Sequence, residues 1–147
     1  MAEQSIPPTD AAAAVAPLKM ERARYSNGMV SAGFPSPADD YLDQKLDLNE
    51  HLVKHPAATF FVRAIGDSML GAGIHSGDLL VVDRSLEATS GRIVIAALDG
   101  ELTVKRLREQ GETVYLLPEN PNYETITVKA ESDFEIWGVV TAVVHAL

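Results

Sequence analysis

The sequence predicts a mainly β fold, a compact domain of twisted antiparallel strands that begins near residue 34 and follows a mobile N-terminal arm. Seven segments rich in β-branched and aromatic residues lie between residues 59 and 144, each bounded by Gly, Pro, Asp or Asn. Helix signals occur at few positions, so we expect only one or two short helices. The 147 residues, 46% of them apolar, are enough for one domain with an ordinary buried core.

The first 32 residues form the predicted arm. They are rich in alanine and contain a single aromatic residue, Tyr25, so they cannot bury much surface. The apolar stretch at residues 11–18 is too short to span a membrane, and no basic residues precede it as they do in a signal peptide. We therefore expect no membrane association and a cytoplasmic location. The next segment, "SAGFPSPADD", contains two prolines and is expected to be extended and accessible.

One short helix of about two turns is predicted in "DLNEHLVKHP". Asp47 can cap its first turn, Glu50 can reach back to the cap, and Pro56 ends it. The strands follow this helix, and Asp99-Gly100 between two of them is a strong hairpin signal. The predicted strands are residues 59–64, 78–83, 91–98, 101–107, 113–119, 124–130 and 134–144.

Charge and cysteine content exclude several classes of function. The chain has 12 basic and 21 acidic residues, a formal charge of −9, which opposes the phosphate contacts of direct nucleic-acid binding. Any role at DNA would have to act through a partner protein. Without cysteine the chain has no disulfide, no thiolate nucleophile and no zinc knuckle.

The four histidines do not predict a site by themselves. His51 and His55 stand four residues apart on the predicted helix, but no third ligand has a distinctive spacing, so a solvated helix face is the preferred interpretation. His75 and His145 have no catalytic acid or nucleophile placed near them in sequence, so no Ser-His-Asp triad can be assembled. We expect neither a metal nor another cofactor.

Ser68 and Lys105 are the residues that carry chemistry. Taken alone, a serine in the turn "AIGDSMLGAG" is a local hydrogen-bonding device, and a lysine in the strand "GELTVKRL" faces solvent. Together they allow another interpretation, because a neutral lysine can replace histidine as the base for a serine nucleophile. Burial among apolar neighbours such as Val104 would have to lower the lysine pKa by roughly 3 units.

The order of these motifs carries a family resemblance. "GDSM" after an apolar strand, "GDLLVVD", and "GRIVIAALDGELTVKRL" with its lysine 37 residues after the serine resemble the LexA/UmuD-type self-cleaving Ser-Lys peptidase family, S24. "SAGFPSP" supplies the small residue and glycine that such enzymes cut, here Ala32-Gly33, and it is most similar to the UmuD branch. The repressor branch is disfavoured, because the 32 residues before Gly33 are too few for a helix-turn-helix domain.

The resemblance implies a catalytic Ser68–Lys105 dyad and an oxyanion hole formed by the backbone N–H groups of Asp67 and Ser68. It implies that residues 1–32 are removed by self-cleavage and that residues 33–147 are the active peptidase domain. It further implies a homodimer, a RecA filament on single-stranded DNA as co-protease, and a UmuC-type Y-family polymerase as the partner in translesion synthesis during the SOS response.

Two other functions remain open at the level of sequence. The chain could be a non-enzymatic acidic module that docks DNA-repair partners, with Ser68 only capping a turn. It could also be related to signal peptidases, which pair serine with lysine, although no anchoring segment supports that interpretation.

Overall fold

The computed structural model describes residues 5–6, 23–25 and 44–147. Ala32, Gly33 and most of the predicted arm lie outside these residues. The chain divides into two units, residues 18–54 and residues 1–17 with 55–147, and we describe each by itself.

The described residues of the smaller unit form a two-stranded antiparallel sheet and one helix. β2 (Ala23–Tyr25) pairs with β3 (Gln44–Leu46), and α2 (Leu48–Leu52) follows. The Asp47 carboxylate accepts a hydrogen bond from the Asn49 N–H at 3.0 Å, which confirms the predicted cap.

The helix is shorter than the sequence predicts. It stops before Val53, which is extended, because the residues leading to Pro56 are disfavoured in the helical conformation. His55 therefore does not lie on the helix with His51, and the prediction that both stand on one helix is wrong.

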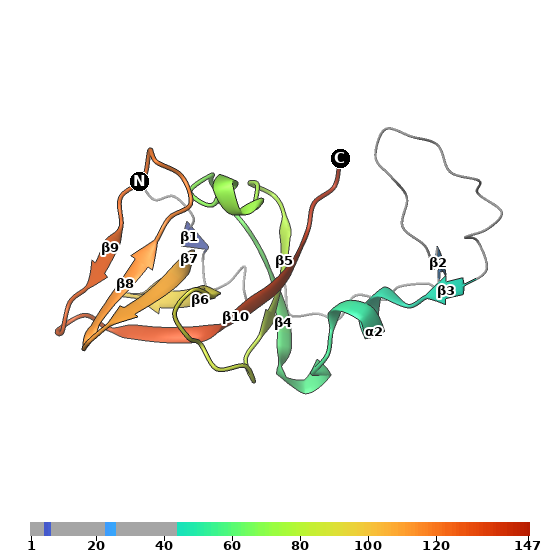
Figure 1. The fold of residues 1–147 in the computed structure, drawn as a ribbon, viewed down its shortest axis with the longest axis horizontal. Helices are drawn as coiled ribbons and strands as arrows, with labels where there is room; N and C mark the ends of the chain where they lie inside the picture. Colours follow the sequence, from blue (N-terminus) through green and yellow to red (C-terminus); the bar gives the residue numbers. More distant parts are fainter. Residues whose placement is uncertain (1–4, 7–22, 26–43) are drawn as a thin grey trace. The chain divides into compact units, whose positions relative to one another are not determined.

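The described strands of the larger unit form a single antiparallel sheet. In the described residues its strand order is β4-β5-β10-β6-β7-β8-β9, and β1 pairs with β7 off this path (Figure 1). The strands are β1 (Ser5–Ile6), β4 (Thr59–Arg63), β5 (Leu79–Asp83), β6 (Ile93–Leu98), β7 (Glu101–Gln110), β8 (Thr113–Leu117), β9 (Ile126–Val128) and β10 (Phe134–Val144). Two 3₁₀ turns accompany them, η2 (Pro56–Ala58) and η3 (Leu70–Ala72).

These strands confirm the predicted mainly β class, and each of the seven predicted segments corresponds to one strand, although β7 runs three residues beyond the predicted end at residue 107. The Asp99-Gly100 turn is confirmed as well: Leu98 pairs with Glu101 across it. Asp99 and Gly100 have φ angles of 50° and 88°, as a tight two-residue hairpin requires. The strands β1, β2 and β3 have no counterpart in the sequence prediction.

Both faces of the sheet are covered by apolar side chains. Along β6, Ile95 belongs to one cluster with Val62, Leu80 and Val104, whereas Val94 and Ala96 belong to another with Leu107, Leu116 and Val139. Alternation along the strand sends neighbouring side chains to opposite faces. The central strands are therefore buried on both sides. No helix among the described residues is long and apolar enough to cross a membrane.

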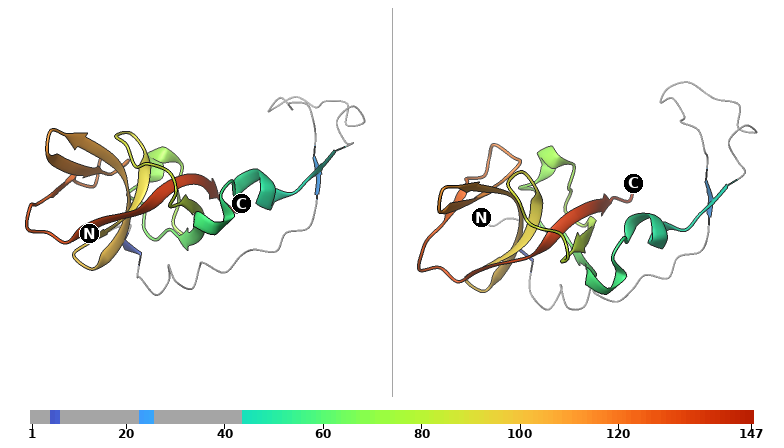
Figure 2. Two further views of the ribbon diagram at one scale, coloured as in Figure 1. Left: turned by 90° about the horizontal axis from the view of Figure 1, so that it is seen from below. Right: turned by 60° about the horizontal axis from the view of Figure 1, so that its bottom comes forward.

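β10 joins the two halves of the sheet, because it pairs with β6 through its first residues and with β5 through its last (Figure 1; two further views in Figure 2). Its register shifts between Ile136 and Gly138 and again between Val140 and Ala142. Gly138 lies against β5 at the first of these irregularities. A Cβ atom there would lie 2.7 Å from Val82 Cγ1 and 3.1 Å from the Asp83 carbonyl oxygen.

Gly138→Ala is therefore expected to lower the free energy of unfolding by roughly 1–3 kcal/mol, because the added methyl group overpacks the β10–β5 junction. Denaturant unfolding measures this effect. Val143→Ala, at a residue of the same strand that is 37% exposed, is the control and should change stability less. Equal effects for the two variants would contradict the tight junction.

Candidate active site

The serine turn begins where β4 ends, and neighbouring loops hold it in place. The Ala64 N–H donates to the Asp78 carbonyl at 2.9 Å, and the Gly77 N–H donates to the Ala64 carbonyl at 2.8 Å. The Gly66 N–H donates to Ser76 Oγ at 3.1 Å. These bonds attach the start of the turn to the loop that precedes β5.

The other side of the turn is attached to the segment that follows β8. The Glu119 N–H donates to the Ser68 carbonyl at 2.7 Å, and the Gly71 N–H donates to the Glu119 carbonyl at 2.7 Å. Asn120 Nδ2 donates to the Asp67 carbonyl at 2.8 Å. The Tyr123 hydroxyl donates to the Asp67 carboxylate, and this hydrogen bond raises the pKa of Tyr123.

The Ser68 side chain is fully buried, and its Oγ has no hydrogen-bond partner among the described residues. A buried hydroxyl without a partner is unfavourable, so an unpartnered one is typical of a strained or catalytic position. In the same described residues, the backbone N–H groups of Asp67 and Ser68 have no acceptor. The turn thus combines a free hydroxyl with two free donors, the groups that a nucleophile and an oxyanion hole need.

Lys105 is buried in the middle of β7. Only 3% of its surface is exposed, so the expectation that such a lysine taken alone faces solvent is wrong. Its Nζ donates to Thr103 Oγ1 at 2.8 Å. Burial lowers the pKa of Lys105 from 10.5 to about 8, which brings the neutral amine within reach near physiological pH.

The apolar neighbour that shares a face with Lys105 is on the adjacent strand. Val94 lies directly across from Lys105 in the β6–β7 register and is fully buried. Val104, the neighbour expected from sequence, is buried in the cluster on the opposite face of the sheet, because successive residues of a strand alternate. The burial of Lys105 therefore comes from the packing of the sheet rather than from its neighbour in sequence.

Glu119 connects the serine turn to the lysine strand. Its backbone binds Ser68 and Gly71, and its carboxylate accepts a hydrogen bond from Arg106 Nε at 2.6 Å. Arg106 follows Lys105 in β7 and pairs with Leu117 of β8. Both candidate residues thus lie on elements that meet at one segment. Lys105 Nζ donates to Thr103 and not to Ser68 Oγ in this structure.

Sequence reasoning missed Thr103, Glu119, Asn120 and Tyr123. Thr103 could have been found, because a residue two positions before Lys105 in a strand shares its face. The other three act on the serine turn from about 50 residues away in sequence, and no local pattern indicates such a contact.

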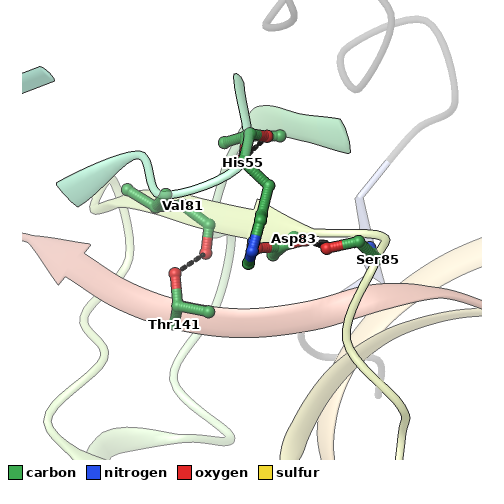
Figure 3. A network of polar contacts seen from close by, with 6 residues as sticks. His55, Val81, Asp83, Ser85 and Thr141 are labelled. Atoms are coloured by element: carbon green, nitrogen blue, oxygen red, sulfur yellow. Dashed lines mark hydrogen bonds and ion pairs between the residues drawn. The ribbon is translucent and has the colours of Figure 1, made fainter. Parts of the chain in front are cut away.

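Ser85, His55 and Asp83 lie close together near the start of β4, but not in the order of a catalytic triad (Figure 3). His55 Nδ1 lies 2.6 Å from Asp83 Oδ2, and Ser85 Oγ donates to Asp83 Oδ1 at 2.6 Å. In a catalytic triad the histidine stands between the acid and the serine. Here the carboxylate is in the middle, so His55 cannot take a proton from Ser85.

The remaining two histidines do have an acid beside them. Asp78 lies against both His75 and His145 in the fold, which the search for a catalytic acid near them in sequence did not reveal. No serine belongs to this group, so it is not a triad either.

Comparisons with known proteins show the family to which the chain belongs. Residues 24–141 match the family model described as Peptidase S24-like. Protein SamA of Salmonella typhimurium strain LT2 is 55% identical over 114 residues, which are 78% of this chain and 79% of that protein. Protein ImpA of Escherichia coli is 50% identical over 120 residues, 78% of this chain and 77% of that protein. A LexA repressor of Idiomarina loihiensis is 42% identical over 119 residues, 80% of this chain and 58% of the repressor.

The buried lysine makes stability depend on pH. Its folded-state pKa of about 8 lies below its ordinary value of 10.5, so the charged form destabilises the folded chain, and this penalty disappears as pH rises from 8 to 10.5. Relative to Lys105→Met, the parent should gain about 3 kcal/mol of unfolding free energy over that range. Denaturant unfolding measures it, with Ser68→Ala in both proteins to prevent self-cleavage. A stability difference that does not change with pH would contradict the low pKa.

Proposed function

The chain belongs to the Peptidase S24-like family of serine peptidases, and on this premise we propose that it cuts its own Ala32-Gly33 bond with a Ser68–Lys105 dyad. The observation that carries the proposal is the pair of buried groups: a Ser68 hydroxyl without a partner and a Lys105 amine of lowered pKa. The Ser68 turn is hydrogen-bonded to the backbone of Glu119, and β7, which carries Lys105, is attached to the Glu119 side chain through Arg106.

In the first step, neutral Lys105 takes the proton of Ser68 Oγ as that oxygen attacks the carbonyl carbon of Ala32. Charge develops on the carbonyl oxygen, and the free N–H groups of Asp67 and Ser68 are suited to receive it. Protonated Lys105 then gives its proton to the nitrogen of Gly33, and the peptide bond breaks. Water, deprotonated by Lys105, releases Ala32 from the serine ester and restores both side chains.

Thr103 acts as a positioning residue for Lys105. Its hydroxyl oxygen accepts the hydrogen bond from Nζ, which holds the long lysine side chain on the buried face of β7. The amine must then move from Thr103 towards Ser68 Oγ when the substrate segment is in place. A base of this kind works best when its pKa is close to the working pH.

The edge of β7 offers a place for an extended substrate. β1 pairs there, with Ser5 opposite Thr103 and Ile6 opposite Leu102, two to three residues before Lys105. Backbone pairing at a strand edge is a common way to bind extended peptides. This edge supports the proposal that the segment containing Ala32 and Gly33 reaches the dyad in an extended conformation.

Cleavage must be restrained, because a chain that always held its own bond in the site would destroy itself. We therefore propose that the segment containing Ala32 and Gly33 is rarely docked in the site, and that a RecA filament on single-stranded DNA raises the docked fraction. Each tenfold gain in the docked population corresponds to about 1.4 kcal/mol.

The product, residues 33–147, would dimerise and serve a UmuC-type Y-family polymerase in translesion synthesis. The family and its UmuD-like and LexA relatives support a role in the SOS response. The net charge of −9 agrees with action through protein partners rather than on DNA itself.

Purified full-length protein held at alkaline pH should release a fragment that begins at Gly33, as measured by mass spectrometry. Ser68→Ala and Lys105→Ala should each abolish this release, because they remove the nucleophile and the base. Ser85→Ala is the control and should cleave normally, since Ser85 only binds Asp83. Cleavage that persists in Ser68→Ala would end the assignment, and a chain that is never cut would favour the non-enzymatic binding module.

The rate of cleavage should follow the ionisation of Lys105. Below pH 8 the neutral fraction of Lys105 falls about tenfold for each unit by which the pH decreases. The cleavage rate should therefore rise about tenfold per pH unit up to about pH 8 and stay constant above it. Single-turnover rates at several pH values measure this profile. A rate that is flat between pH 6 and pH 8 would exclude Lys105 as the base.

A further inference from the structure

Three possible metal ligands meet at one end of the β5–β10 pair. His75 lies in the turn before β5, Asp78 immediately precedes β5, and His145 immediately follows β10. Val144 pairs with Leu79, so the antiparallel register brings His145 next to Asp78. None of these residues takes part in the proposed cleavage.

The ligand atoms of the three side chains converge. His145 Nδ1 lies 2.5 Å from Asp78 Oδ1, and His75 Nδ1 lies 3.6 Å from Asp78 Oδ2. The two imidazole rings stack with centroids 4.4 Å apart. One ligand atom from each of the three residues can be chosen so that all lie within 4.8 Å of one another.

The charge at this position favours a cation. The Asp78 side chain is 3% exposed, whereas those of His75 and His145 are 48% and 42% exposed. Burial disfavours the charged carboxylate, but hydrogen bonds from the backbone N–H of His75 and from the His145 ring outweigh this effect and lower the pKa of Asp78. A nearly buried anion is thus flanked by two imidazoles that are open to water.

We propose that His75, Asp78 and His145 bind a divalent transition metal, with Zn²⁺ as the favoured ion. Two imidazole nitrogens and one carboxylate oxygen suit Zn²⁺, and a fourth position is left for water. The backbone N–H of His75 donates to Asp78 Oδ2 at 2.7 Å and orients the carboxylate. Metal ligands in proteins are commonly oriented by hydrogen bonds of this kind.

The geometry needs only a small adjustment. Zn²⁺ distances of about 2.0–2.2 Å place tetrahedral ligand atoms roughly 3.3 Å apart. The His145 ring must therefore move slightly away from Asp78. The proton in the hydrogen bond between them must leave to solvent when the metal binds. Both imidazoles are half-exposed, one in a turn and one at a strand end, so neither is held by core packing.

The metal would stiffen the support of the serine turn. The Asp78 carbonyl accepts the Ala64 N–H, and Ser76 Oγ accepts the Gly66 N–H, so the loop that carries two ligands also holds the start of that turn. The metal would attach the end of β10 to this loop. The site is nevertheless independent of the dyad, and its existence does not depend on cleavage.

Titration of the untagged full-length chain with Zn²⁺ at about pH 7.5, above the ordinary histidine pKa, tests the proposal. We expect one Zn²⁺ per chain by calorimetry, and a visible absorption typical of tetrahedral coordination when Co²⁺ is used. His75→Gln and His145→Gln should each weaken Zn²⁺ binding at least tenfold. Glutamine can still donate a hydrogen bond to Asp78, so these variants should keep the fold.

Two histidine variants outside the cluster serve as controls. His51→Gln removes an exposed imidazole from α2, and His55→Gln removes one that pairs with Asp83. Both should bind Zn²⁺ as the parent does. Equal binding by His145→Gln and the parent, or loss of binding in His55→Gln instead, would overturn the site. Absence of binding to the parent would show that the cluster is held by hydrogen bonds alone.

Discussion

The two hydrogen bonds between the serine turn and Glu119 are the constraint on which the candidate site depends. They join a turn after β4 to a segment after β8, and the Glu119 side chain joins the same segment to β7 through Arg106. Close backbone contact makes this possible: a Cβ on Gly71 would lie 2.7 Å from the Glu119 carbonyl oxygen. Only glycine allows the turn to approach this closely, so Gly71 fixes the position of Ser68 without touching any reacting group.

The site also shows how stability is given up for chemistry. Lys105 lies on a face with Val94 across from it, where an apolar side chain would avoid the cost of burying an amine. Ser68 adds a second buried polar group, and its hydroxyl has no partner among the described residues. Packing alone would favour an apolar residue at both positions. Strain of this type tends to collect where function requires it and is offset by the surrounding core.

The strands could be predicted from sequence because their signals are local. β10 begins and ends where its apolar pattern does, and the Asp99-Gly100 turn has the conformation that this pair of residues favours. The burial of Lys105 could not be predicted, because it depends on both faces of β7 being covered. Likewise, Asn120 reaches Asp67 from 53 residues away and His145 reaches Asp78 from 67 residues away. Such contacts follow from the order of strands in the sheet rather than from any local pattern.

The edge of β7 near Leu102, where β1 pairs, has a consequence for aggregation. Backbone N–H and C=O groups at a strand edge can pair with an extended chain, and among the described residues β1 pairs with a two-residue stretch of this edge. A foreign strand could therefore add to the sheet there and start aggregation. The charge of −9 opposes unspecific encounters of this kind, because like-charged copies repel each other unless a complementary interface joins them. The acidic composition thus protects the sheet at the edge that the proposed substrate segment would use.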